Sequence, residues 1–269
     1  MTWYDALILG IVQGLTEFLP VSSSGHLEIG HVVLHTSGEE NLAFAVLVHA
    51  ATVLSTIVVL WYEIMRLIKG TFATMSWNEE KSYVAKILVS MIPVFVVGMF
   101  FKDQVEGFFG KGLLVVGICL LVTACLLALS EWLQKRRLSS GHEVTYKDAV
   151  IIGVAQAVAV LPGLSRSGTT IATGLLCGVK KEKVAQFSFL MVLIPIMGEA
   201  LLDMMKILNG TEAVTIGWLP AVAGFIAAFA TGCFACRFMI EIVRRQRLMW
   251  FALYCLLIGS GAIVYTLCC

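Results

Sequence analysis

The decapeptide LPGLSRSGTT, which runs from Leu161 to Thr170, is a polar turn between two strongly apolar stretches of the chain. Pro162 and Gly163 are expected to end the preceding helix, and Ser167 to cap the next one. The N-H groups at a helix start, together with the guanidinium of Arg166, suit a phosphate group. The stretch is therefore either a phosphate loop or an ordinary surface loop between two membrane spans.

The composition around this stretch is that of an integral membrane protein. Of the 269 residues 59% are hydrophobic and only 14% are charged, and the mean hydropathy is +0.90, far outside the soluble globular range. Charged clusters, not alternating polar residues, interrupt the apolar runs, which predicts helices and excludes barrel strands. The net charge of +1 argues against a nucleic-acid partner.

A second interrupted segment lies at the start of the chain. A helix is predicted from Trp3 to Leu19, a loop follows Pro20, and a short helix is expected from His26 to about Leu34. Neither half is long enough to cross a hydrocarbon core of ~30 Å. We therefore predict a re-entrant hairpin enclosed by other helices, and a second such hairpin over residues 148–178.

The two hairpins resemble each other at an offset of 143 residues. Matching positions are Asp5 with Asp148, Gly10 with Gly153, Gln13 with Gln156, and the run 22–25 with 165–168. Three predicted spans separate the hairpins, so the second copy should enter the membrane from the opposite side. The fold class predicted is an all-α integral membrane protein with about six transmembrane helices and two re-entrant helix-loop-helix hairpins related as inverted repeats.

We expect a single membrane domain over residues 1–269, with repeats at approximately 1–133 and 146–267. Basic residues cluster in loops near 66–81, 135–147 and 237–247, which the positive-inside rule places in the cytoplasm. Both termini and the mouth of the first hairpin then face outward. The predicted spans are Leu42 to Tyr62, Tyr83 to Phe101, Leu113 to Leu133, Val184 to Met205, Trp218 to Phe238, and Leu248 to Leu267.

Several side chains near the first loop suggest chemistry. Gln13 and Glu17 are four apart and share a helical face. A carboxylate in a membrane segment costs ~2.5–3.5 kcal/mol on insertion scales, which favours a catalytic or metal-binding role. Glu17 could instead be an interfacial residue or a structural partner of Arg166. His26 suits a general base, a general acid or a phosphate acceptor, or else a simple helix cap.

The repeats have diverged in a complementary way. Ser23 aligns with Arg166 at the offset of 143, so one copy supplies Glu17, His26 and hydroxyls while the other supplies the cation. If the two tips meet, these groups form equipment for phosphoryl transfer. His49, between Val48 and Ala50, is expected to point into the bundle.

The segments Gln13 to His26 and Pro162 to Thr170 resemble the (E/Q)xxxE-SS(S/T)GH and PGxSRSxxT motifs of the undecaprenyl-diphosphatase family, the bacitracin-resistance phosphatases of the bacterial inner membrane. The resemblance covers essentially the whole chain. It implies hydrolysis of undecaprenyl diphosphate to undecaprenyl phosphate and inorganic phosphate. The product is the lipid carrier for peptidoglycan and other cell-wall polymers, so roles in cell shape and antibiotic resistance follow.

The resemblance also implies site residues and a cofactor. Glu17, Ser23, His26 and Arg166 match the family's active-site residues, and Glu17 and Gln13 would bind a divalent cation, Mg²⁺ or Ca²⁺. The family's site faces the periplasm. Substrate would be bound by Ser22, Ser24, Gly25, Gly163, Ser165, Ser167 and Thr170.

This sequence departs from the family pattern at two positions and leaves other points open. Many members have Glu where this chain has Gln13, which removes one negative charge from a metal site. Relatives typically have Gln at the position of His49, so its contact with the site is undetermined. The nucleophile is Ser23, with His26 or Glu17 taking its proton, or alternatively water oriented by His26.

Phosphate is expected to bind Arg166 and the N-H groups that follow Ser24 and Ser167. The rival function is a transporter or flippase of phosphorylated polyprenyl lipid, because inverted repeats also build transporters. The lipid chain length, any flipping of the product and the oligomeric state, including a homodimer, are not fixed by the sequence.

Overall fold

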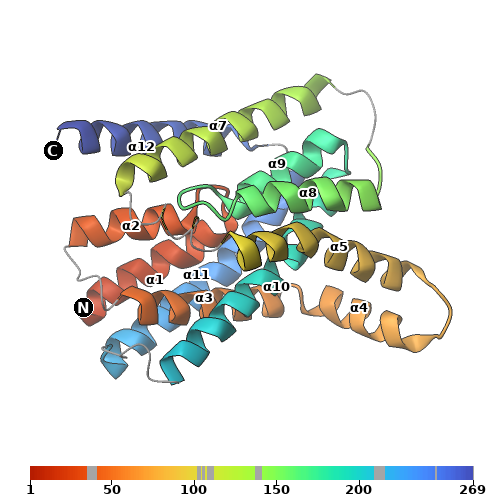
Figure 1. Cartoon of the computed structure of the whole chain (residues 1–269), viewed down its shortest axis with the longest axis horizontal. Helices are drawn as coiled ribbons and strands as arrows, with labels where there is room; N and C mark the ends of the chain where they lie inside the picture. The colour runs from red at the N-terminus through yellow and green to blue at the C-terminus, as the bar shows by residue number, and fades with distance from the viewer. Residues whose placement is uncertain are drawn as a thin grey trace.

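The computed structural model describes residues 1–34, 41–101, 104, 107, 112–136, 141–208, 216–245 and 247–268, and within these it is helical apart from turns, loops and one isolated bridge between His142 and Val179. Its helices run nearly side by side through an elongated bundle (Figure 1). Five of them are long and apolar enough to cross a membrane, which confirms five predicted spans: α5 (Glu79–Phe100), α7 (Leu113–Arg136), α10 (Lys181–Leu208), α11 (Trp218–Arg244) and α12 (Met249–Cys268).

The first predicted span corresponds to α3 (Asn41–Val59). It is followed at once by α4 (Trp61–Ala73), and the two helices are bent by 72° at Leu60. Together they pass the same test of length and hydropathy, which gives up to six spans. The sequence did not predict α4 as a separate helix. It packs against α5 at the end of the bundle (Figure 1).

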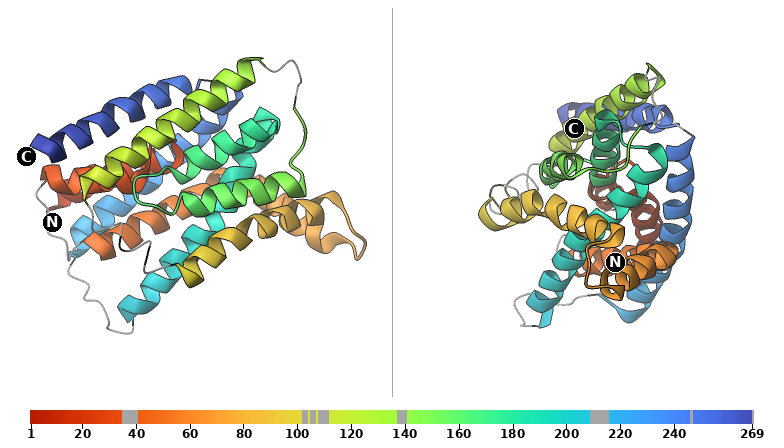
Figure 2. Two further views of the ribbon diagram at one scale, coloured as in Figure 1. Left: turned by 45° about the horizontal axis from the view of Figure 1, so that its top comes forward. Right: turned by 90° about the vertical axis from the view of Figure 1, so that its right-hand side faces the viewer.

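Both predicted hairpins are present. The first is formed by α1 (Trp3–Phe18) and α2 (Ser23–Leu34), and the second by α8 (Tyr146–Val158) and α9 (Arg166–Cys177). Figures 1 and 2 show that their mouths open toward opposite ends of the bundle while their tips meet in the middle. The two termini lie at the end onto which the first hairpin opens (Figure 1).

The hairpins begin with the same local structure 143 residues apart. The Thr2 side chain and Asp5 form a capping box at the start of α1, and Thr145 and Asp148 form the same box at the start of α8. Each box pairs two N-H groups that the first turn of a helix leaves without partners. The inner helices also begin at matching positions, Ser23 and Arg166. This correspondence supports a duplicated origin.

Helices of the two halves pack reciprocally. The hairpin helix α1 lies along α11, whereas α8 lies along α5, and α7 lies along α12. Gly14 lets α1 approach α11, because a Cβ atom there would collide with the carbonyl oxygen of Ala228. Each hairpin is thereby covered by a span from the other half, as irregular backbone within a membrane requires.

The outer surface of the bundle is apolar. Exposed side chains include Phe95 on α5, Phe234 on α11, and Trp250 and Leu257 on α12, all more than 60% exposed. A soluble protein rarely exposes so much contiguous apolar area, whereas lipid tails cover it without cost. The surface therefore agrees with a multi-span membrane protein.

Candidate active site at the hairpin junction

The tips of the two hairpins touch each other. The N-H of Gly163 donates to Oγ of Ser24 at 3.4 Å, and Oγ of Ser167 donates to the carbonyl of Leu19 at 3.3 Å. These four residues lie in the two motifs, about 140 positions apart in the sequence. The predicted meeting of the two half-sites is confirmed.

The first tip is a tight turn that puts three serines, Ser22 to Ser24, in a row. Pro20 follows the end of α1, and Ser22 adopts a left-handed conformation with φ of 69°, which is uncommon for a residue other than glycine. Helix α2 then begins at Ser23, three residues before the predicted start at His26. The prediction missed these residues because serine is a weak helix former, but at a helix start its hydroxyl offers a capping hydrogen bond.

The second tip is capped by Ser165 and not by Ser167. Oγ of Ser165 accepts from the N-H of Gly168 at 3.0 Å, so α9 begins at Arg166. The cap lies two residues earlier than predicted because the turn at Gly163, with φ of 85°, ends sooner. Ser167 is thus freed from capping and reaches the other tip, while its Oγ lies 3.3 Å from that of Ser165.

Two N-H groups expected to bind phosphate are engaged within the tips. The N-H of Gly25, which follows Ser24, donates to Oγ of Ser22 at 3.3 Å. The N-H of Gly168, which follows Ser167, donates to the cap Ser165. In this structure both N-H groups are thus bonded to hydroxyls of their own tips, and phosphate binding by them stays a prediction.

The hydroxyl of Thr170 is also engaged locally. Its Oγ1 donates to the carbonyl of Arg166 at 2.9 Å and lies 3.2 Å from that of Ser167, inside its own helix. Its hydrogen is thus directed away from any bound phosphate.

Glu17 is the centre of the polar cluster. Its Oε2 accepts hydrogen bonds from Oγ of Ser23 at 2.6 Å and from Nε2 of Gln13 at 2.8 Å. The positive charge of Arg166 acts on the same carboxylate. Only 6% of the Glu17 side chain is exposed, so these interactions act with little screening by solvent. Glu17 lies near the end of α1 and is buried among these partners.

His49 also lies at the cluster. Its Nε2 is 3.8 Å from Oε2 of Glu17, and its Nδ1 is 2.7 Å from the carbonyl of Ala45. A carbonyl only accepts, so Nδ1 carries a hydrogen and Nε2 is the nitrogen that faces the carboxylate. The structure thus answers the question that the sequence left open: His49 belongs to the site.

His26 was considered as a base for Ser23, but its ring nitrogens contact other groups. Its Nδ1 is 2.8 Å from the carbonyl of Ser22, and its Nε2 is 2.8 Å from the hydroxyl of Tyr254 on α12. The hydroxyl of Ser23 is bonded to Glu17 instead. Of the two bases considered for Ser23, Glu17 is the one that is hydrogen-bonded to it in this structure.

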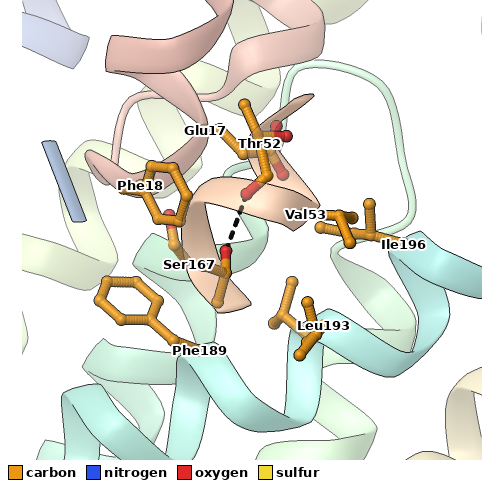
Figure 3. A pocket seen from close by; sticks show the side chains of 10 residues that line it. Glu17, Phe18, Thr52, Val53, Ser167, Phe189, Leu193 and Ile196 are labelled. Carbon is orange, nitrogen blue, oxygen red and sulfur yellow. Dashed lines mark hydrogen bonds between the residues drawn. The ribbon is translucent and has the colours of Figure 1, made fainter. Parts of the chain in front are cut away.

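A narrow pocket opens beside Glu17 and Ser167 (Figure 3). One wall comes from α3, where Thr52 and Thr56 lie one turn apart. The rest of its lining is apolar: Phe18, Val53, Phe189, Val192, Leu193 and Ile196. The junction therefore has a polar end next to a small apolar pocket, a combination suited to an amphiphilic ligand.

The donors at the site fit a divalent cation. Within the described residues, no group of three or more His, Cys, Asp or Glu side chains gathers to hold a metal ion. Gln13, however, has a buried Oε1 without a hydrogen-bond partner, next to the carboxylate of Glu17. Amide and carboxylate oxygens are the ligands that Mg²⁺ and Ca²⁺ prefer.

Sequence reasoning missed three contributors because they come from distant helices. Tyr254 of α12 contacts His26, Thr123 of α7 accepts from the N-H of Ser165 at 3.3 Å, and Thr52 of α3 lines the pocket. Each comes from an otherwise largely apolar helix. No motif identified them, although an isolated polar residue in a membrane span is itself a signal of function.

Comparisons with known proteins agree with one another. The family model described as bacitracin resistance protein BacA matches residues 6–261. A protein of Parabacteroides distasonis named undecaprenyl-diphosphatase is 57% identical over 270 residues, covering 99% of each chain. One of Bacteroides fragilis with the same name is 57% identical over 266 residues, covering 98% of each. Another, of Methanococcus vannielii, is 38% identical over 264 residues, covering 97% of this chain and 99% of its own.

Proposed function

The chain belongs to the family of the bacitracin resistance protein BacA, and we propose that the junction of its two hairpins is the active site of a membrane phosphatase. The enzyme hydrolyses undecaprenyl diphosphate to undecaprenyl phosphate and inorganic phosphate, the reaction named for its relatives. The product is the carrier lipid of cell-wall synthesis. The family description connects the protein with bacitracin resistance.

One observation carries the proposed site: Oγ of Ser23 donates to Oε2 of Glu17 at 2.6 Å. A hydroxyl bonded to a buried carboxylate has a base in place for its proton, which is the arrangement of an activated nucleophile. Ser23 is also the first residue of α2, where the positive end of the helix dipole favours an incoming anion.

In the first step, the oxygen of Ser23 forms a bond to the terminal phosphorus and its proton passes to Glu17. The bond from that phosphorus to the bridging oxygen breaks, and undecaprenyl phosphate leaves. In the second step, the oxygen of water forms a bond to the phosphorus of the phosphoserine, the bond from that phosphorus to Oγ of Ser23 breaks, and the proton of water passes to His26, which then releases it to solvent. Ser23 recovers its proton from Glu17, and inorganic phosphate is released.

Arg166 would bind and orient the diphosphate through its planar guanidinium, because charge stabilisation and alignment supply most of the catalysis in phosphoryl transfer. Its charge already acts on Glu17, so the cation and the base lie within reach of one substrate. The hydroxyls of Ser22 and Ser24, 3.4 Å apart at the same tip, are placed to bind further phosphate oxygens.

Glu17 and Gln13 would hold a divalent cation, Mg²⁺ or Ca²⁺. When bound, the cation would neutralise part of the diphosphate charge. Support comes from the partnerless Oε1 of Gln13. Removal of the cation with a chelator should lower phosphate release, and addition of either ion should restore it.

The apolar pocket beside Glu17 would receive the first isoprenoid units while the rest of the tail stays in lipid. Phe18 and Phe189, whose rings meet edge to face at 5.7 Å, form one side of it. The phosphate end would then lie at the serines, and the chain would leave between helices toward the membrane.

The enzyme would lie in the bacterial inner membrane with the site reached from the periplasm. The distribution of basic loops supports this orientation, as does the common end shared by both termini and the first hairpin's mouth (Figure 1). A homodimer is one possible state that the sequence left open. Sedimentation of the solubilised protein would measure it.

The activity is tested by measuring phosphate release from undecaprenyl diphosphate in detergent. The wild type should release phosphate, and Ser23→Ala should lose about 10³-fold or more in kcat. Ser260→Ala, an exposed serine on α12, is the matched control and should be unaffected. Acid quenching with substrate labelled on the terminal phosphate should leave label on Ser23. Full activity of Ser23→Ala would refute the covalent route.

A further inference from the structure

The imidazole of His26 is held on both sides. Its Nδ1 lies 2.8 Å from the carbonyl of Ser22, and a carbonyl can only accept, so Nδ1 carries the hydrogen. In the neutral ring the lone pair is then on Nε2. The hydroxyl of Tyr254, 2.8 Å away, donates to that nitrogen.

Tyr254 contacts the same ring a second way. Its own ring is nearly parallel to that of His26, with an interplanar angle of 13° and centroids 5.5 Å apart. The neighbouring Cys255 is buried and its Sγ lies 3.5 Å from the carbonyl of Pro20, so α12 is anchored against the first tip at this level. Tyr254 is therefore fixed beside His26 by the packing of its helix.

A hydroxyl group can form this hydrogen bond with His26 in both protonation states of the imidazole. It donates to Nε2 when His26 is neutral, and it accepts from Nε2-H when His26 is protonated. For Nε2 to take up a proton while this contact holds, the hydroxyl passes its own hydrogen to Nε2 and receives one from water. A phenylalanine would keep the ring stacking and lose the hydrogen bond in both states.

We propose that Tyr254 is a positioning residue for His26, which fixes the ring so that Nε2 is the nitrogen that exchanges protons during catalysis. The consequence for the reaction rests on the proposed function, in which His26 takes the proton of the attacking water. The hydrogen bond between Tyr254 and His26 is an observation that does not depend on the proposed function. Tyr254 is 40% exposed, so the pair lies at the edge of the site.

Three variants separate the hydrogen bond from the packing. Tyr254→Phe removes the hydroxyl alone, and Tyr254→Ala removes the ring as well. Tyr265→Phe is the matched control, because Tyr265 lies on the same helix, is 51% exposed and is far along the helix from the site. All are made in the full-length chain in detergent.

The first measurement is carbethoxylation of His26 by diethyl pyrocarbonate, which reacts with an unprotonated imidazole nitrogen and is quantified by mass spectrometry. If the hydroxyl shields Nε2, Tyr254→Phe should raise the labelling rate about threefold to tenfold, and Tyr265→Phe should not change it. If Tyr254→Phe labels like the wild type and only Tyr254→Ala labels faster, the ring merely covers His26 and the proposal is overturned.

The second measurement is steady-state phosphate release. Tyr254→Phe should lower kcat roughly tenfold and leave KM within about twofold, since positioning of a proton-transfer group acts on the chemical step. Unchanged kcat would also overturn the proposal. If the wild type released no phosphate at all, the proposed function would fail, and the labelling rates would still decide whether Tyr254 positions His26.

Discussion

Replacement of Glu17 by glutamine tests the central pair with a change of almost no volume. The amide keeps the size of the side chain but cannot take the proton of Ser23. The hydrogen bond of 2.6 Å between the two residues marks Glu17 as the base, and proton transfer to a positioned base contributes about 10²–10⁴-fold. Glu17→Gln should therefore raise the activation free energy by about 3–5 kcal/mol.

The fold should survive this replacement. The replacement removes the charge-assisted hydrogen bonds that Glu17 accepts from Ser23 and Gln13, which destabilises the protein. It also removes the free-energy cost of burying a charged carboxylate whose side chain is only 6% exposed. The two effects oppose each other, so the free energy of unfolding should change by less than about 2 kcal/mol.

The assay is phosphate release from undecaprenyl diphosphate, with thermal unfolding of the same samples. Glu28→Gln is the matched control, because Glu28 is exposed and lies on α2, the other helix of the hairpin. A folded Glu17→Gln protein that kept more than about a third of wild-type kcat would refute the assignment of Glu17 as the base.

Other residues give further predictions. Gly163→Ala should destabilise the protein by about 2 kcal/mol or more in thermal unfolding, because φ is 85° and the new Cβ would lie 2.6 Å from a Cα of α7; Gly98→Ala, with open space around it, should be neutral or stabilising. Glu131→Ala should cost about 1–3 kcal/mol, because it removes the acceptor, at 2.6 Å, of the first N-H of α12. Removal of the exposed Glu241, paired only with a residue one turn away, should cost under about 0.5 kcal/mol. Gln13→Glu should tighten Mg²⁺ or Ca²⁺ binding about tenfold in calorimetry, and unchanged affinity would contradict the proposed ligand set.

The sequence was sufficient to locate the two hairpins and the membrane spans along the chain. Pro20 and Pro162 mark the two broken segments, the offset of 143 residues relates them, and hydropathy locates the spans. The reason is that a membrane imposes length, polarity and pairing rules that are local in the sequence. The pairing of Glu17 with Ser23 also lies within one short motif, so their proximity could be expected.

Contacts between distant helices could not be read in this way. His49 and Tyr254 reach the site through the packing of α3 and α12, and nothing in their neighbouring residues specifies which helix they will meet. The cap at Ser165 was missed for a different reason: Ser165 and Ser167 can both cap a helix, and only the backbone turn at Gly163 selects one of them.

Because the two halves pack reciprocally, the first hairpin can reach its packed state only after helices of the second half have been synthesised. The first hairpin carries Glu17 and Ser23 and is made within the first 34 residues, but its covering helix α11 begins only at Trp218. Until that helix has left the ribosome and entered the bilayer, the polar tip has no partner along α1. The N-terminal half alone should thus be a substrate for membrane proteases, and the last fifth of the chain sets the moment at which the molecule is finished.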